Sequence, residues 1–397
     1  MTKWRTDVSS TNDPVIVVGG GIGGMSTALA LGRSGQAVHL VEQADQFGEV
    51  GAGLQVGPNV MRIFDRLGVI DAVREIAFFP KNLILRDALS ELELTRIALD
   101  QSFRDRFGYP YATIHRADLH AALTEACSAL DAVRLQTGCK VVDFEQRSGE
   151  VLVRTEAGEE IRGSALVGAD GLRSGTREHV LADGEPRVTG HVAYRAVLPM
   201  SEVPEHLRSD SVVIWGGPDL HLAHYPLRRG ELFNMGAIFH SHLFREGANV
   251  FGDPEELHAH FGGVCESVAA LLKRIEEWRM WVLRDRDPVE RWTDGLVTLL
   301  GDAAHPTLQY LAQGAGMAIE DAWTLADRLS ACPGVPAAFR EYERLRLVRT
   351  ARVTLMSRLY GDVYHASGVA RDVRAQMLEG WPALAARESL AWIYQGI

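Results

Sequence analysis

The amino-acid sequence predicts an α/β fold in which a doubly wound parallel sheet is interrupted by a mixed β-sheet region and followed by C-terminal helices. A β-branched run at 14–18 leads directly into a glycine-rich turn and then into an alanine- and leucine-rich stretch at 25–35. A second apolar run at 37–41 completes a strand–helix–strand unit, with which parallel sheets begin. Between 190 and 284 the apolar residues alternate, as in strands with one buried face.

The remaining elements follow from the same patterns. A hairpin is expected where apolar runs at 151–155 and 160–163 flank Ala157 and Gly158. Further strands are expected at 165–168, 211–215, 221–227, 232–239 and 296–300, turns at 216–218 and 229–230, and helices at 315–329 and 339–359.

The order of these elements predicts a discontinuous nucleotide-binding domain. Apolar strands typical of a parallel sheet return at 165–168 and 296–300, after β-rich interruptions. The expected domains are a nucleotide-binding domain at 1–78, 110–186 and 285–340, a substrate-binding β domain at 79–109 and 187–284, and a C-terminal helical region at 341–397.

Composition limits the class of protein. The chain has 397 residues, 46% of them hydrophobic and 23% charged, which suits a globular protein with a sizeable core. The net charge of -11 argues against nucleic acid as a partner. No run approaches the roughly 18 apolar residues of a membrane span, and the N-terminal stretch lacks a signal-peptide pattern. We therefore expect a soluble cytoplasmic protein.

The four cysteines lie far apart, without a C-x-x-C pair. This spacing predicts neither a disulfide framework nor a thiolate zinc site, and no His/Cys cluster suggests another metal. The cysteines are Cys127, Cys139, Cys265 and Cys332.

Five arginines lie between 340 and 352. An anion site is one interpretation, but we expect a solvated helix face on which the arginines pair with Glu341 and Glu343. The arginines are Arg340, Arg344, Arg346, Arg349 and Arg352.

The glycine-rich turn has the spacing of a dinucleotide-binding motif, Gly19-x-Gly21-x-x-Gly24. The first glycine allows a tight turn, the second lets a pyrophosphate approach the backbone, and the third lets helix and strand pack closely. Glu42 follows the second strand, where an acidic residue binds ribose hydroxyls. No second such motif follows a strand, so a nicotinamide cofactor would bind only transiently.

Two further motifs each follow an apolar strand. They are Gly168-Ala-Asp-Gly-Leu-Arg-Ser174 with Arg177, and Gly301-Asp-Ala-Ala-His-Pro306 with Gly314-Ala-Gly316. With the glycine motif they occur in the order of three fingerprints, and nearly the whole chain resembles the class A flavoprotein aromatic hydroxylases, the p-hydroxybenzoate hydroxylase-like monooxygenases. The resemblance implies a Rossmann-like FAD-binding domain of the glutathione reductase type.

The resemblance also implies which residues contact FAD. It places Asp302 at the ribityl chain, and the backbone N–H groups of Gly314 and Ala315 near the pyrimidine ring, where a helix start stabilises negative charge. Arg116 matches an arginine that reaches FAD, and Asp170 an aspartate involved with both FAD and NAD(P)H. The full expected set is Gly19, Gly21, Ile22, Gly23, Gly24, Glu42, Gln43, Gly51, Ala52, Gly53, Arg116, Val141, Asp170, Asp302, Gly314 and Ala315.

Within this family, segments 47–58, 79–82, 221–227 and 305–313 are similar to those of 3-hydroxybenzoate 6-hydroxylases. The similarity implies bound FAD, NADH as a transient co-substrate, and a small aromatic acid and O₂ as substrates. It further implies gentisate as the product, formed through a flavin C4a-hydroperoxide, and a homodimer.

The candidate substrate residues come from the strand at 221–227 and from Gln309. Side chains at 221, 223 and 225 share one face of a strand, whereas His224 faces the other way. A neutral histidine is a suitable base for a phenol near pH 7. The resemblance implies that His221 is this base, that Gln309 is its catalytic partner, and that Tyr225 binds the substrate carboxylate. His305 is expected to have a positional role.

Several alternatives stay open. On the same scaffold, a salicylate 1-hydroxylase would release catechol and a hydroxynicotinate monooxygenase would release a dihydroxypyridine. A flavin dehydrogenase or oxidase would reduce FAD without hydroxylating a ring. A non-catalytic FAD-binding protein is disfavoured by the presence of His221 and Gln309 beside all three motifs.

Overall fold

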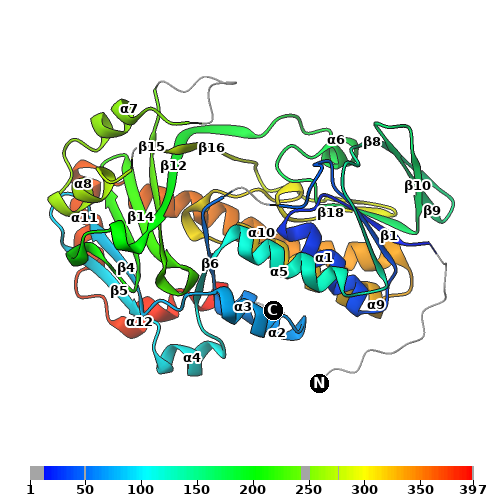
Figure 1. The fold of residues 1–397 in the computed structure, drawn as a ribbon, viewed down its shortest axis with the longest axis horizontal. Helices are drawn as coiled ribbons and strands as arrows, with labels where there is room; N and C mark the ends of the chain where they lie inside the picture. The colour runs from blue at the N-terminus through cyan, green and yellow to red at the C-terminus, as the bar shows by residue number, and fades with distance from the viewer. Residues whose placement is uncertain (1–12, 49–50, 243–250, 276, 396–397) are drawn as a thin grey trace.

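Two large β-sheets organise the chain in a computed structural model, which describes residues 13–48, 51–242, 251–275 and 277–395 (Figure 1). A six-stranded sheet has the order β17-β18-β11-β1-β2-β7, and its strands are parallel except for β17. The strands are β1 (Val15–Val18), β2 (Val38–Val41), β7 (Val133–Gln136), β11 (Ala165–Gly168), β17 (Thr293–Asp294) and β18 (Val297–Leu299). The predicted parallel sheet is confirmed.

Helices α1 (Ile22–Arg33), α5 (Arg116–Ser128) and α9 (Gly314–Ala331) pack together on the parallel sheet. Helices α1 and α9 approach closely because α1 begins with glycines. A Cβ on Gly23 would lie 3.2 Å from the Ala318 side chain on α9. The β-branched residues of β1 are fully buried between sheet neighbours and helices, which explains its continuous apolar sequence.

Smaller elements surround this sheet. The hairpin expected at 151–163 is confirmed as β9 and β10, which form a three-stranded antiparallel sheet with β8. Strands β3 and β6 form a separate pair. The elements are β3 (Gly53–Val56), α2 (Pro58–Arg66), α3 (Ile70–Ile76), α4 (Gln101–Phe107), β6 (Ala112–His115), β8 (Val141–Arg147), β9 (Glu150–Thr155), β10 (Glu160–Gly163) and α6 (Gly175–Leu181).

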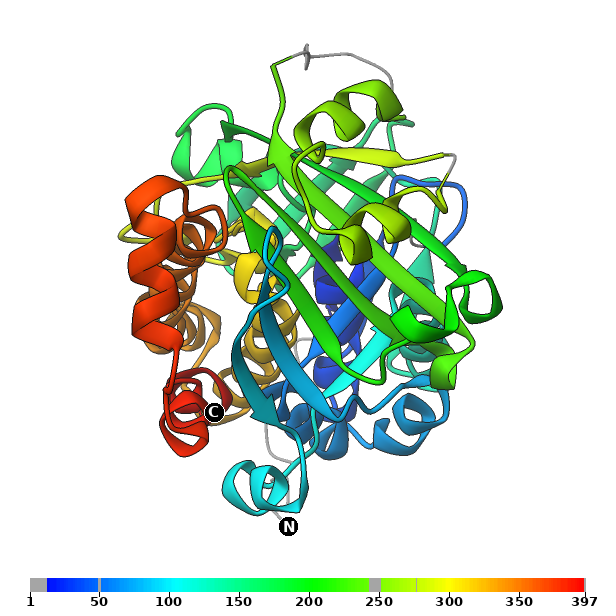
Figure 2. The ribbon, with the colours of Figure 1, turned by 90° about the vertical axis from the view of Figure 1, so that its left-hand side faces the viewer.

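The second large sheet is mixed and has seven strands in the order β16-β12-β15-β14-β13-β4-β5 (Figure 2). One face is covered by α7 (Pro254–His260) and α8 (Glu266–Leu272), and the other faces the parallel sheet and the C-terminal helices. Its strands are β4 (Asn82–Asp87), β5 (Glu93–Ala98), β12 (Arg187–Pro199), β13 (Val212–Gly217), β14 (Leu220–Leu227), β15 (Leu232–His240) and β16 (Arg279–Asp285). They fall within 79–109 and 187–284, apart from the last residue of β16.

The sequence-based boundaries need two corrections in this part of the fold. Gly216 and Gly217 were expected in a turn, but both lie in β13, where they pair with β14. The turn lies at Pro218–Asp219, and Asp219 adopts a positive φ of 57°. The helix expected at 339–359 is longer, because α10 covers Val335–Tyr364.

Helix α10 runs from one sheet toward the other, and α11 (Gly368–Leu378), α12 (Ala383–Glu388) and α13 (Ala391–Tyr394) follow it (Figure 1). The expected solvated arginine face is correct for Arg344, which is exposed and bonds Glu341 at 2.7 Å. It is wrong for Arg346 and Arg349. Arg346 is buried and forms ion pairs with Glu320 at 2.7 Å and Asp321 at 2.6 Å, and Arg349 pairs with Glu320 at 2.5 Å, so both join α10 to α9.

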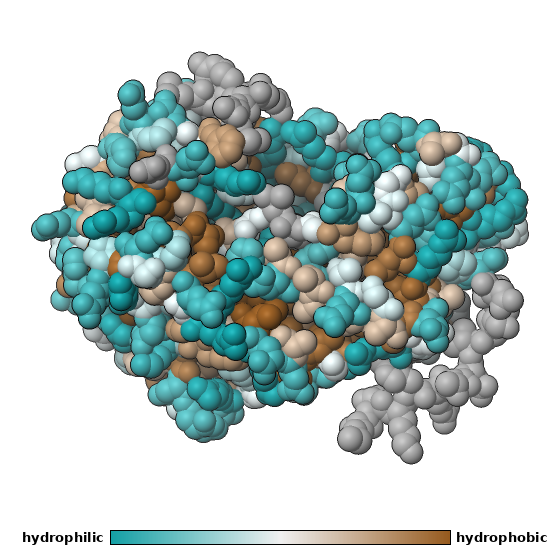
Figure 3. All heavy atoms as spheres, in the orientation of Figure 1, coloured by the Kyte–Doolittle hydropathy of each residue, from teal (hydrophilic) through white to brown (hydrophobic). Residues whose placement is uncertain are grey.

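Hydrophilic side chains cover much of the face shown in Figure 3, and hydrophobic side chains gather toward its middle, between the two sheets. Within the described ranges, no helix is long and apolar enough to cross a membrane. All four cysteines are free thiols.

Candidate active site

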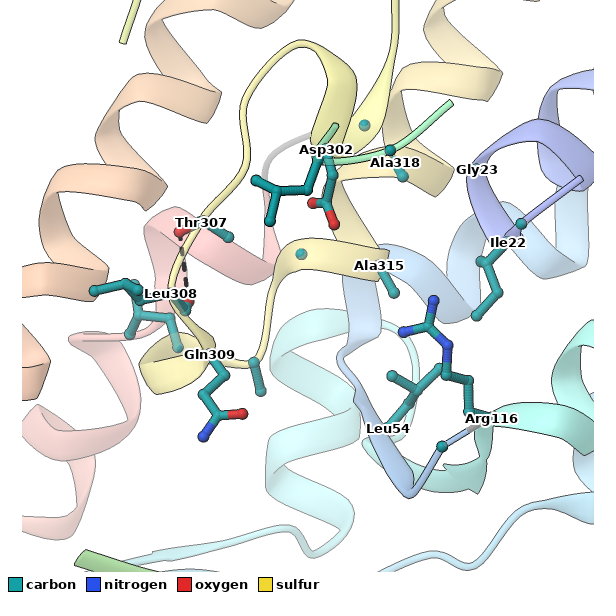
Figure 4. Close-up of a pocket in the computed structure, with 18 of the residues that line it drawn as sticks. Ile22, Gly23, Leu54, Arg116, Asp302, Thr307, Leu308, Gln309, Ala315 and Ala318 are labelled. Carbon is teal, nitrogen blue, oxygen red and sulfur yellow. Dashed lines mark hydrogen bonds between the residues drawn. The ribbon is translucent and has the colours of Figure 1, made fainter. Parts of the chain in front are cut away.

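A cavity of about 1340 Å³ lies between the two sheets, and its lining runs from the glycine turn after β1 to side chains on β14 and α13. Figure 4 shows part of this lining, from Ile22 and Gly23 to Gln309. Pockets for small ligands are typically about 300–1,000 Å³. The volume is therefore sufficient for a dinucleotide together with a small aromatic ring. Fourteen of the sixteen residues expected to bind the cofactor line it: Gly19, Gly21, Ile22, Gly23, Glu42, Gln43, Gly51, Gly53, Arg116, Val141, Asp170, Asp302, Gly314 and Ala315.

Gly24 and Ala52, the other two, lie behind the cavity wall. A Cβ on Gly24 would lie 1.9 Å from the backbone oxygen of Gly19, so this glycine is required for close packing of the turn. Gly19 itself has a φ of +107°, which favours glycine. Ala52 is buried, and its backbone oxygen accepts a hydrogen bond from the backbone N–H of Arg116 at 3.2 Å. Both residues shape the site without facing it.

The Glu42 carboxylate is held by two backbone groups. Its oxygens accept hydrogen bonds from Gly20 N at 2.6 Å and Ala44 N at 2.9 Å. A carboxylate has about four acceptor positions, so others are left for ligand hydroxyls. His120 Nε2 donates to Gly20 O at 2.6 Å on the other side of the turn. His120 was not predicted from the sequence, although it lies four residues after Arg116 on α5, and this spacing places both on one helix face.

The aspartate–glycine motif is tied to the glycine–aspartate motif by an arginine. Asp170 accepts hydrogen bonds from Ser174 Oγ at 2.5 Å and from Thr176 N at 3.0 Å. The buried Arg177 donates to the backbone oxygens of Ala303 and Ala304 at 2.8 and 2.7 Å. The two motifs, which are far apart in the sequence, are therefore one structural unit.

The N-terminus of α9 opens into the cavity. In Figure 4, Asp302 and Ala315 lie on the same side of the pocket, with Arg116 and Leu54 opposite them. Gln313 occupies the N-cap position without a side-chain cap bond, so the first backbone N–H groups of the helix are available to a ligand. The partial positive charge of a helix N-terminus stabilises an anionic ring.

These features fit FAD. A Cβ on Gly20 would lie 2.9 Å from the Phe47 ring, and one on Gly51 would lie 3.0 Å from Arg116 Cδ, so the cradle has no room for larger residues. Its donors are backbone N–H groups and Arg116, as an anionic pyrophosphate requires. Glu42 could accept hydrogen bonds from a ribose at the end of the turn.

His221 lies at the other end of the cavity, on β14. His221, Ala223 and Tyr225 all line it, whereas His224 points to the opposite face, where Trp215 Nε1 donates to His224 Nε2 at 3.1 Å. The strand parity predicted from the sequence is therefore confirmed. Burial, with a smaller contribution from Arg86, lowers the pKa of His224 to about 3.

His221 forms a hydrogen bond with a second histidine. Its Nδ1 lies 2.7 Å from Nε2 of His365, which caps the C-terminus of α10. Burial, followed by the neighbouring His365 and His191, holds the pKa of His221 well below its usual value. Burial and then His191 lower the pKa of His365 to about 3. Both rings are therefore neutral near pH 7, and one donates to the other. His365 was not predicted, since no sequence motif surrounds it.

Tyr225 contacts the glycine-rich loop, and its role at the substrate carboxylate stays a prediction. Its hydroxyl donates to Gly53 O at 2.8 Å, while Gly53 N donates to Oδ1 of Asn234, the cross-strand partner of Tyr225, at 2.8 Å. The one hydroxyl proton is used in this bond, so Tyr225 would have to break it in order to donate to a carboxylate. The two side chains fix the start of β3 against the mixed sheet.

Gln309 lies on the short turn Gln309–Leu311 and faces the cavity (Figure 4). Its Oε1 accepts a hydrogen bond from Arg195, a residue that sequence analysis did not select. His305 points elsewhere, and its Nε2 donates to Asp321 at 2.6 Å within the buried network between α9 and α10. The positional role expected for His305 agrees with this contact.

The fold and this site define an FAD-dependent monooxygenase with a pocket for an aromatic substrate. The chain belongs to the FAD-binding domain family, whose model matches residues 12–355. It is 43% identical over 382 residues to a 3-hydroxybenzoate 6-hydroxylase of Polaromonas naphthalenivorans (strain CJ2), covering 96% of this chain and 95% of that one.

Two further proteins extend the comparison. A 3-hydroxybenzoate 6-hydroxylase of Klebsiella oxytoca is 44% identical over 380 residues and 96% of each chain. The crystal structure of Klebsiella pneumoniae HpxO complexed with FAD and uric acid superposes with a TM-score of 0.85 at 25% identity, covering 98% of this chain and 98% of that one. The predicted family, fold and flavin cofactor are confirmed.

Proposed function

We propose that this protein converts 3-hydroxybenzoate to 2,5-dihydroxybenzoate (gentisate). In the overall reaction, 3-hydroxybenzoate, O₂, NADH and a proton give gentisate, NAD⁺ and water. The main structural support is the neutral His221, which lines the same cavity as Gln309, at the end away from the dinucleotide cradle. The relatives named for this activity give independent support.

His221 is suited to accept the phenol proton. Its Nδ1 is engaged with His365, which leaves Nε2 as the ring nitrogen available to a substrate. For Nε2 to act as the acceptor, the proton of the neutral ring must sit on Nδ1 and be donated to His365 Nε2. In this tautomer pair His365 Nε2 is the acceptor and His221 can act as a base. Removing the phenol proton increases electron density at the ring carbon para to the hydroxyl.

Bound FAD would supply the electrons from NADH and the electrophilic oxygen from O₂. The chain orients the aromatic ring and excludes water from it. Burial raises the pKa of Tyr310 above its usual value and raises that of Tyr225 to about 12, so both phenols stay neutral. The aromatic wall contains Tyr111, Tyr310, Tyr360, Tyr364, Trp281 and Tyr394.

Product analysis tests the proposal. The FAD-loaded protein is incubated with NADH and 3-hydroxybenzoate, salicylate or 6-hydroxynicotinate, and the products are separated by chromatography. We expect gentisate from 3-hydroxybenzoate alone. Catechol from salicylate or a dihydroxypyridine from 6-hydroxynicotinate would favour the corresponding alternative. NADH consumption that gives only H₂O₂ with all three acids would contradict the assigned substrate.

NADH as the reductant, a homodimeric assembly and a cytoplasmic location complete the proposal. They rest on the resemblance and on composition. Comparing NADH with NADPH in the same assay tests the reductant, and the molar mass in solution tests the assembly.

A further inference from the structure

Arg195 on β12 differs from the other arginines of the interior. It lines the substrate end of the cavity, and its guanidinium lies over the Trp281 ring at 5.6 Å and donates to Gln309 Oε1. Among the described residues it forms no ion pair with a carboxylate. The buried arginines all do: Arg177 and Arg286 with Asp183, Arg346 with Glu320 and Asp321, and Arg374 with Asp87.

The residues paired with Arg195 across the mixed sheet are small, and we call the part of the cavity wall that they form the floor. Arg195 pairs with Gly236, which pairs with Ala223 on the next strand. An ideal Cβ on Gly236 would lie 4.0 Å from Arg195 Cγ, so the arginine stem passes beside this glycine. Gly236 and Ala223 are small and line the cavity, with Ile238 Cδ1 3.6 Å from the position of that Cβ, so there is room for a planar ring beside the guanidinium.

The neighbouring rows place this floor between two other candidate groups. His221 and Tyr225 lie two residues before and after Ala223 on β14, each displaced along the strand by about 7 Å. A ring above Ala223 would therefore direct one substituent toward His221 and leave another to meet Arg195. A benzoate with a meta hydroxyl has two polar groups that fit such an arrangement.

Electrostatics favour an anion beside Arg195. The side chain is only partly exposed, and burial lowers its pKa, yet a guanidinium stays protonated in proteins. A positive charge held away from water is costly unless a negative group pairs with it. The described carboxylates that line the cavity, Glu42, Asp143, Asp170 and Asp302, belong to its dinucleotide end. Tyr225 is not an anionic partner for Arg195, because its hydroxyl keeps its proton and donates it to Gly53 O.

We propose that Arg195 binds the carboxylate of an aromatic acid substrate and, through its bond to Gln309 Oε1, turns the Gln309 amide nitrogen toward the substrate hydroxyl. This inference rests on the proposed function and names the group that selects acids over neutral phenols. A planar guanidinium can donate two parallel hydrogen bonds to a carboxylate while a further N–H stays on Gln309.

Ligand binding to the FAD-loaded protein without NADH tests the inference. The flavin absorbance is followed while 3-hydroxybenzoate or the uncharged 3-hydroxybenzamide is added at pH 7.5. We expect the wild type to bind the acid more tightly. Arg195→Met should raise the Kd of the acid about 100-fold and change that of the amide less than about threefold. Arg195→Lys, which keeps the charge, should give an intermediate loss.

Arg279→Met is the matched control. Arg279 is the cross-strand partner of Arg195 on β16, but it is exposed and outside the cavity lining, so both Kd values should stay unchanged. Wild-type protein that binds acid and amide equally would overturn the inference without any variant. Equal losses for both ligands in a folded, FAD-loaded Arg195→Met would also overturn it, because Arg195 would then act on the shared phenol or on structure.

The two proposals fail separately. Charge-selective binding that depends on Arg195, but no gentisate on turnover, would reject the assigned reaction and keep the carboxylate site. Gentisate formation with no charge-selective binding would do the reverse.

Discussion

The two ends of the cavity differ in the groups that form them, which are mostly backbone at the dinucleotide end and side chains at the substrate end. The dinucleotide end consists mostly of backbone from consecutive residues, such as the turn at 19–24 and the start of α9. The substrate end consists of side chains from β12, β14, the turn at 309–311 and the end of α10. A backbone site requires glycines at fixed spacing, whereas a side-chain site requires only that distant elements meet.

The largest effect is expected at the backbone end. Gly24→Ala would place a Cβ 1.9 Å from Gly19 O, a contact that only a shift of the turn can relieve. We expect loss of FAD and a destabilisation of more than about 3 kcal/mol. The FAD-to-protein ratio and chemical unfolding measure both. Gly263→Ala is the control, because Gly263 is exposed and its new Cβ would meet nothing within 4 Å. A Gly24→Ala protein with full FAD content would refute this account.

Substitutions at the substrate end should reduce hydroxylation without loss of FAD. His221→Ala is expected to reduce hydroxylation by about 100-fold or more at unchanged FAD content, which is the usual range for a general base. The product formed in a single turnover is the measurement. His224→Gln serves as the control, because His224 lies on the opposite face of β14. Near-normal turnover by His221→Ala would remove His221 from the mechanism.

Two substitutions at His365 distinguish its effect on the tautomer of His221 from its effect on the pKa of His221. In the proposed tautomer pair His365 accepts from His221 Nδ1, so His365→Phe removes that acceptor and activity should fall about tenfold or more at all pH values. His365→Asn keeps an acceptor and removes a neighbour that lowers the pKa of His221, whose larger cause is burial.

The pH dependence of activity shows in which direction the pKa of His221 changes in His365→Asn. His221 is an active base only above its own pKa, so activity falls as the pH drops through that value. Raising the pKa of His221 in His365→Asn should therefore move the acid limb of the kcat/KM profile to higher pH. Other titratable rings contacting the pair are His191, Tyr310 and Tyr364. An unshifted profile in His365→Asn would contradict a coupling between the two histidines.

The smallest effect is expected at Gln309. Gln309→Ala removes one hydrogen bond to the substrate, which corresponds to about a fivefold rise in KM or a comparable increase in uncoupled H₂O₂. Peroxide and product are measured together. Unchanged KM and unchanged coupling would place Gln309 outside the site.

The same contrast explains what could be predicted from the sequence. Gly19, Glu42 and Asp302 belong to motifs whose spacing is imposed by the backbone, and the structure places all three on the cavity wall. Strand parity correctly separated His221 from His224.

Other residues of the site lie outside any sequence motif and could not be predicted. Arg195 and His365 reach the site only because β12 and α10 pack against β14 and the 309–311 turn. The contact between Tyr225 and Gly53 could not be predicted, because the two residues are 172 positions apart in the chain. Arg346 was expected in solvent because the periodicity of its own helix does not show that Glu320 and Asp321 lie opposite.

Helix α13 has a consequence for the order in which the protein matures. Tyr394 contacts Phe103 and Phe107 edge-on, and Ser389, Leu390 and Ile393 line the cavity beside it. Arg349 on α10 donates to the backbone oxygens of Trp392 and Ile393 at 2.9 and 2.7 Å. During translation, a nascent chain that has reached only residue 385 has every dinucleotide-binding motif but an incomplete aromatic chamber. The residues that complete the aromatic chamber are therefore synthesised after all of the dinucleotide-binding motifs.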